Sequence, residues 1–217
     1  MPEKQKGDCD MLSKEKFKYP FYVMVHPFDG FYEIRHREKG SIFVALMLVF
    51  LFGLSYSINR RYASFVVNYI NPRSVDSRVE IAGIFIAVLL FACSNWSITC
   101  LMEGEGRFKD ILTVIGYSLL PMVLTLIPAT ILSWFVASSE EGLYYLIINV
   151  ATIFTVILIV IGIMTIHNYT FGKTLITLFI SFIALLIIIF IILLLIYLLQ
   201  QVYMFFYGLY TEIILKL

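Results

Sequence analysis

Long hydrophobic runs with few polar interruptions dominate the chain from residue 41 onwards. Each run is about 18 residues or longer, the length at which an α-helix crosses about 30 Å of hydrocarbon. Backbone groups inside a bilayer must bond within the protein, and runs this long and this uniformly apolar are unsuited to barrel strands. The pattern therefore predicts an all-α membrane protein with five transmembrane helices, at residues 41–58, 79–102, 111–136, 143–166 and 174–199.

The segment before the first span divides into two parts. Residues 1–16 are polar and basic, and we expect them to form a mobile tail. Residues 17–40 are richer in aromatic side chains, and Pro20 and Pro27 should interrupt any long helix there. A short amphipathic helix after Pro27 should lie at the membrane interface, with aromatics towards lipid and cations towards water. Its interfacial residues are Phe28, Phe31, Tyr32, Arg35 and Arg37.

Hydrophobic positions at helical spacing continue past the first span, from Tyr62 to Ile70. We expect this helix either to project beyond the membrane or to bend along its surface. The middle of the last span is almost entirely Leu, Ile and Phe, without a stripe of small residues, so it should face lipid. The five-span domain would cover residues 41–207, followed by a short tail at 208–217.

Polar residues lie within the second span, at Asn95, Ser97 and Thr99. An asparagine in hydrocarbon is costly unless it is paired. One interpretation is a hydrogen bond between helices, which contributes about 1 kcal/mol. The other is a lining for a polar path, and the sequence leaves both open.

The third predicted span carries two prolines and a glycine. Each proline removes a backbone bond to the carbonyl four residues earlier, so Pro121 frees the carbonyl of Tyr117 and Pro128 frees that of Leu124. Gly116 would allow another helix to approach closely. These residues predict a kinked helix that serves either for packing or as a hinge.

A charged loop with two glycines precedes this span. It consists of Glu103, Gly104, Glu105, Gly106, Arg107, Phe108 and Lys109. Asp110 follows, where its side chain can cap the next helix, and the glycines permit a tight turn. The loop is either a solvated membrane edge or a docking surface for a partner protein.

Composition and charge exclude several classes of function. Hydrophobic residues make up 60% of the chain and charged residues 14%. The net charge of +1 is too small to attract nucleic acid electrostatically. We find no catalytic or cofactor motif, and no Asp, Glu, Lys or Arg in the middle of a span. His26 and His36 are ten residues apart across a proline, which is poor spacing for a metal site. We therefore expect a protein without enzymatic activity, cofactor or metal.

The distribution of cations predicts the orientation. With five spans and a cytoplasmic N-terminus, eleven of the 16 Lys and Arg residues lie on the inside. The positive-inside tendency favours this arrangement, in the cell membrane, with the C-terminus outside. It places the charged loop on the cytoplasmic side.

The loop and the helix after it resemble the Yip-domain family of multi-span membrane proteins. The resemblance rests on Gly104, Gly106 and Phe108, followed by Gly116, Tyr117 and Pro121. Residues 26–41 look like the short amphipathic helix of bacterial members, and the Asp-Leu-Tyr-Gly-Pro signature of eukaryotic members is missing. The resemblance implies a five-span core and association with other membrane machinery, including sugar importers of the ABC type.

Three functions remain open from the sequence. The first is a non-enzymatic accessory protein that binds or positions another integral membrane protein, through the 103–109 loop among other surfaces. The second is a channel or facilitator for a small solute, lined by the polar residues of the second span. The third is a lipid-active protein that shapes the bilayer. Lipid is a partner in each case, and a homo-oligomer is compatible with all three.

Overall fold

The computed structural model describes residues 14–215, with side chains from residue 16 to 214. It is 84% helical, and the described part of the chain contains no strand. Five helical segments are long and apolar enough to cross a membrane. The structure therefore confirms the predicted all-α fold with five spans.

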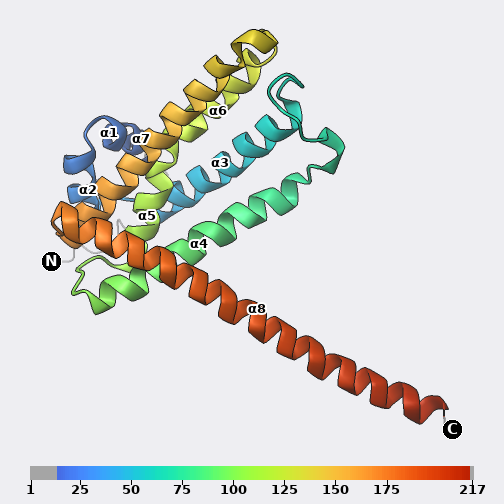
Figure 1. Ribbon diagram of the computed structural model, residues 1–217. Helices are drawn as coiled ribbons and strands as arrows, with labels where there is room; N and C mark the ends of the chain where they lie inside the picture. The colour runs from blue at the N-terminus through green and yellow to red at the C-terminus, as the bar shows by residue number, and fades with distance from the viewer. Residues whose placement is uncertain (1–13, 216–217) are drawn as a thin grey trace.

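Three of these segments run side by side in the upper part of Figure 1. They are α3 (Ile42–Tyr62), α6 (Leu120–Leu132) and α7 (Glu141–His167). Before them in the chain, α1 (Lys14–Val25) and α2 (Pro27–His36) pack at the end where α3 begins. Because α2 packs against α7 and α1 against α5, this end of the bundle is covered by short helices.

The remaining elements are α4 (Ser77–Leu101), α5 (Phe108–Ser118) and α8 (Phe171–Leu215), with 3₁₀ turns at Pro72–Ser74 and Ser138–Glu140. The α4 helix starts near the end of the bundle where α3 finishes, and it meets α8 at the end where α3 begins. From there α8 extends alone, away from all the other helices (Figure 1). The molecule thus has a packed part and a long protruding helix.

The third predicted span is two helices rather than one. α5 ends at Ser118, Leu119 caps it, and α6 begins at Leu120 with Pro121 in its first turn. The Leu119 amide donates to the carbonyls of Gly116 and Tyr117. The Tyr117 carbonyl, to which Pro121 has no amide hydrogen to donate, therefore still has a hydrogen-bond partner. The break lets α5 turn into the centre of the bundle, where residues Asp110 to Ser118 are all buried.

The first span ends earlier than its hydrophobic pattern indicates. The α3 helix stops at Tyr62, so the pattern up to Ile70 neither projects nor bends as a helix. The Arg60 carbonyl, in the last turn of α3, accepts instead from the side-chain amide of Asn68 at 2.6 Å. Val67 is buried, whereas Phe65 and Tyr69 are more than 80% exposed. The hydrophobic positions between Tyr62 and Ile70 therefore belong to a packed turn with exposed aromatic side chains, and not to a continued helix.

Helical structure also begins earlier than expected at the N-terminal side. α1 starts at Lys14, three residues before the expected boundary, and continues through Pro20. Pro20 lies inside α1, as its seventh residue, so it removes one internal backbone bond without ending the helix. Pro27 does separate two helices, since it stands at the first position of α2. The rest of the predicted 1–16 tail lies outside the described residues.

The last span does have a stripe of small residues, which corrects the expectation from its sequence. Thr174, Thr177 and Ser181 are fully buried on α8. They pack against α4, where Ser94 donates to the Ser181 carbonyl at 2.9 Å. The stripe was missed because it lies in the first third of the helix, before the Leu- and Ile-rich middle. Beyond it, all residues from Phe190 to Tyr210 are exposed, as expected for a lipid-facing helix.

Candidate functional site

The interfacial helix α2 is held between the bundle and the surface. Phe31 and Ile34 are buried in the core cluster, whereas Phe28 and Tyr32 are more than half exposed. Phe31 therefore packs inside the protein, unlike the other two aromatics. A short helix has room for one buried face, and Phe31 lies on the same face as Ile34.

The basic residues of α2 make ion pairs on two sides. Arg35 lies 3.6 Å from Asp110 of α5, and Arg37 pairs with Glu33 within α2 at 2.9 Å. Lys39 also pairs with Glu33, and Tyr19 of α1 donates to the same carboxylate. Arg35 thus connects α2 to α5, whereas the Tyr19 hydroxyl connects it to α1.

The charged loop is fastened to the same cluster. Arg107 donates to Asp110 at 3.0 Å and to Glu38 at 2.8 Å, and Lys109 donates to Glu38 at 3.2 Å. Asp110 also accepts from the backbone amide of Arg107, so its side chain satisfies the N-cap amide at the start of α5. The two cations predicted for docking are therefore engaged within the protein.

These contacts shift the pKa values of the charged groups involved. The bonds from Arg107 and Lys109 hold the pKa of Glu38 below its ordinary value of 4.5. The bond from Lys39 does the same for Glu33. Bonds to Asp110 and Glu38 raise the pKa of Arg107, and burial with the nearby Glu33 raises that of Tyr19. Each of these contacts favours the charged form of Glu33, Glu38 and Arg107 and the neutral form of Tyr19.

The two loop glycines are required by a close contact that the sequence did not reveal. The amide of Gly106 donates to Nδ1 of His167 at 3.1 Å. A Cβ on Gly104 or on Gly106 would lie 2.6 Å from the His167 ring. No glycine among the described residues has a positive φ, so these two provide space rather than an unusual backbone angle.

His167 is the site residue that sequence reasoning missed. It is 1% exposed at the last position of α7, although its place at the end of a span suggested a residue in water. Asn168 follows it in the left-handed region at φ 55°, which turns the chain so that Tyr169 stacks on the histidine ring. The one signal in the sequence was the His-Asn pair, because Asn is a frequent helix-ending residue in this conformation.

Two acidic residues of the loop face outward. Glu103 and Glu105 are exposed, and within the described part of the chain they make no ion pair. Phe108 lies partly buried, with its ring against Trp96 of α4. Of the seven residues in the predicted docking surface, the two glutamates remain open to solvent.

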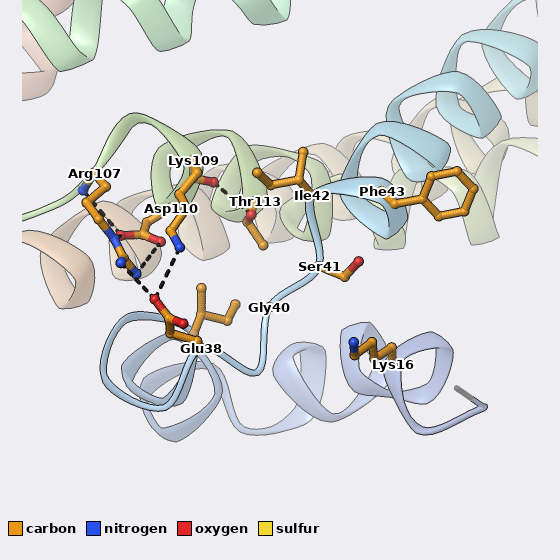
Figure 2. Close-up of a pocket in the computed structure, with 11 residues that line it drawn as sticks. Lys16, Glu38, Gly40, Ser41, Ile42, Phe43, Arg107, Lys109, Asp110 and Thr113 are labelled. Carbon is orange, nitrogen blue, oxygen red and sulfur yellow. Dashed lines mark hydrogen bonds and ion pairs between the residues drawn. The ribbon is translucent and has the colours of Figure 1, made fainter. Parts of the chain in front are cut away.

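A cavity of about 290 Å³ lies beside this cluster, between α1, the start of α3 and α5. Figure 2 shows Lys16 on one side and Arg107, Lys109 and Asp110 on the other, with the chain from Glu38 to Phe43 between them. The cavity thus joins charged side chains to the beginning of the first span.

The other predicted residues fall in three places. Asn95 donates to Ser181 at 3.2 Å, Thr99 is buried and bonds within α4, and Ser97 is exposed on the opposite side of that helix. These three side chains therefore line no common surface. Tyr117 accepts from the amide of Ser41 at 3.0 Å.

Gly116 lies at a close crossing of α5 and α3. A Cβ there would be 2.7 Å from both the Cβ and the carbonyl oxygen of Ala45. Pro128 lies inside α6, whereas Pro121 is near its start. Gly116 and Pro121 together allow α5 to sit against α3 before the chain turns into α6.

The histidines of the interfacial segment have aromatic neighbours. His26 stacks on Tyr22, and His36 stacks on Tyr32. Among the residues that the structure describes, no group of three or more His, Cys, Asp or Glu side chains could hold a metal ion.

Comparison with known families decides the classification. A family model described as the Yip1 domain matches residues 21–194, from the middle of α1 to the middle of α8. The chain belongs to the Yip1 domain family. This match confirms the resemblance inferred from the glycine-containing loop and the helix that follows it. No curated protein and no solved structure match this Yip1 domain.

Proposed function

We propose that this Yip1 domain is a non-enzymatic membrane protein that binds another integral membrane protein through the C-terminal half of α8. The main support is the exposure of α8, in which every residue from Phe190 to Tyr210 is exposed around the whole helix. The Yip1 family is not known for enzymatic activity. An accessory role needs such a surface, whereas a catalytic role would need a constellation of reactive groups.

Lipid by itself cannot cover α8. Its 45 residues correspond to roughly 67 Å at about 1.5 Å per residue, compared with about 30 Å of hydrocarbon. At a tilt of roughly 40°, the upper end of the usual range, about 26 residues lie in the hydrocarbon. About 19 residues then remain outside it.

The part of α8 outside the hydrocarbon is itself apolar. Since the helix is anchored on α4 from Thr174, its span should end near Gln200 and Gln201. Residues 202–214, here called the distal segment, contain a single charged residue and several exposed aromatics. Exposed aromatic rings favour binding to a partner, because their burial contributes strongly at interfaces. The partner would present a hydrophobic surface that continues beyond the bilayer.

The 103–109 loop offers a second, smaller contact. Arg107 and Lys109 hold the loop in place, and this leaves Glu103 and Glu105 for a basic surface on the partner. In the orientation inferred from the cations, with the N-terminus in the cytoplasm of the cell, this loop and the distal segment lie on opposite sides of the membrane.

Purification of the tagged full chain in mild detergent, followed by mass spectrometry of what accompanies it, tests the proposal. The first variant replaces Tyr203, Phe206 and Tyr210 of the distal segment by Ala. The matched control replaces three equally exposed aromatics within the span, namely Phe179, Phe182 and Phe190.

We expect a stoichiometric membrane protein with the wild type and the control, and its loss with the distal variant. The resemblance makes subunits of ABC-type importers the first candidates. Recovery of the wild-type chain without a stoichiometric partner, or equal retention of the partner by both variants, would contradict the proposal.

A further inference from the structure

The cavity between α1, α3 and α5 combines cations with an opening towards the hydrocarbon. Lys16 reaches it from α1 and Lys109 from α5, and its other wall is the chain from Gly40 to Phe43 (Figure 2). Ile42 and Phe43 are 38% and 51% exposed at the start of the first span. The cavity therefore lies where the polar end of the bundle meets the lipid-facing surface of α3.

Positive charge exceeds negative charge around this cavity. Glu38 and Asp110 are the acidic residues that line it, and each pairs with two cations. Lys16 makes no ion pair with any residue that the structure describes. The cations that line the cavity are Lys16, Arg107 and Lys109, and Arg35 pairs with Asp110 without lining it. Three lining cations against two carboxylates leave a local positive excess that attracts an anion.

The size and polarity of the cavity suit the polar end of a lipid. Its volume of about 290 Å³ corresponds to roughly ten water molecules at about 30 Å³ each, enough for a phosphate and a short polar group. The amide groups in the first turn of α3 have no acceptors within the helix and add to the positive potential. The apolar side at Ile42 and Phe43 distinguishes a lipid from a free phosphate.

We propose that this cavity binds the phosphate headgroup of an anionic phospholipid, with the acyl chains along the exposed side of α3. The phosphate lies between Lys16 and Lys109, while Arg107 keeps the loop and Glu38 in place. The acyl chains pass Phe43 and continue towards Phe50, which is exposed one heptad further along α3. Bound lipid then links α1, α3 and α5 at one membrane surface.

Native mass spectrometry of the delipidated full chain in a neutral detergent tests this site. The probes are phosphatidylglycerol, phosphatidylcholine and inorganic phosphate. The variants are Lys16→Gln, Lys109→Gln and the double substitution. Lys18→Gln is the matched control, because Lys18 is exposed on the same helix and does not line the cavity. Lys16→Gln breaks no ion pair with the described residues, so its result does not depend on the stability of the Glu38 contacts.

We expect the affinity for phosphatidylglycerol to fall about fivefold for each lysine removed, since a cation near an anionic lipid contributes about 1 kcal/mol. Lys18→Gln should bind as the wild type does, and phosphatidylcholine should bind weakly to all variants. An equal loss with Lys18→Gln and Lys16→Gln would overturn the proposal. Inorganic phosphate binding as tightly as phosphatidylglycerol would overturn the assignment to a lipid.

Discussion

The α5 and α8 helices are both strongly apolar, yet they have opposite environments. In the apolar 18-residue stretch of the segment formed by α5 and α6, 61% of the residues are buried within the protein, whereas 6% are buried in that of α8, the most hydrophobic segment. Lipid tails are as apolar as leucine, so hydrophobicity drives a helix into the bilayer without driving it against another helix. Small and hydrogen-bonding residues are what distinguish the buried faces, at Gly116 on α5 and at Thr177 and Ser181 on α8.

The largest effect that tests this contrast should come from Gly116→Leu. The new side chain would meet the backbone of Ala45 on α3, where neither helix can move without displacing the core. We expect a loss of about 3 kcal/mol in the free energy of unfolding, or failure to fold. Thermal unfolding in detergent measures the change. Gly83→Leu on α4 is the control, because a Cβ there has no neighbour within 4 Å. Equal stability of the two variants would remove the basis of the contrast.

A pair of Ile→Ala substitutions compares the two helices directly. Ile111 on α5 is fully buried, and Ile191 on α8 is half exposed. Ile111→Ala should cost about 2–4 kcal/mol, because it leaves a cavity. Ile191→Ala should cost less than about 0.5 kcal/mol, because lipid fills the space. Denaturation in the same detergent gives both values, and a similar cost at the two positions would show that α8 is packed.

A smaller effect is expected at the contact between α4 and α8. Asn95→Leu removes the hydrogen bond to Ser181, and an interhelical bond of this kind contributes about 1 kcal/mol. Cross-linking between cysteines placed on the two helices should fall accordingly. Ser97→Ala is the control, because Ser97 is exposed on the other side of α4 and bonds within its own helix. Unchanged cross-linking in Asn95→Leu would show that the small residues alone hold α8.

The smallest effect is the pH dependence of the cluster at the start of α5. The folded protein lowers the pKa of Glu38, so its ionisation stabilises the fold above the unfolded-state value near 4.5. This contribution is lost as the pH falls through the lower folded-state value. Glu38→Gln should therefore lower the melting temperature slightly at pH 6 and have no effect at the acidic end of a scan. A difference that grows as the pH falls would contradict the assigned ion pairs.

The sequence determined the membrane class, the five spans and the family. Length and apolarity suffice for the spans, because hydrocarbon thickness fixes how many residues a helix needs. The family followed from glycines and a proline whose spacing is local in the chain. The capping role of Asp110 was accessible for the same reason, since its partner is three residues away.

The tertiary structure decided which of these residues meet. His167 lies 61 residues from Gly106, so no local pattern reveals that the loop glycines provide space for its ring. Phe31 looks like any interfacial aromatic until α7 and α5 cover it. Arg107 and Lys109 read as a free surface until Glu38, some 70 residues away, approaches them. The sequence determines which faces of each segment are apolar. The packing of distant segments decides which of these faces are covered by protein and which by lipid.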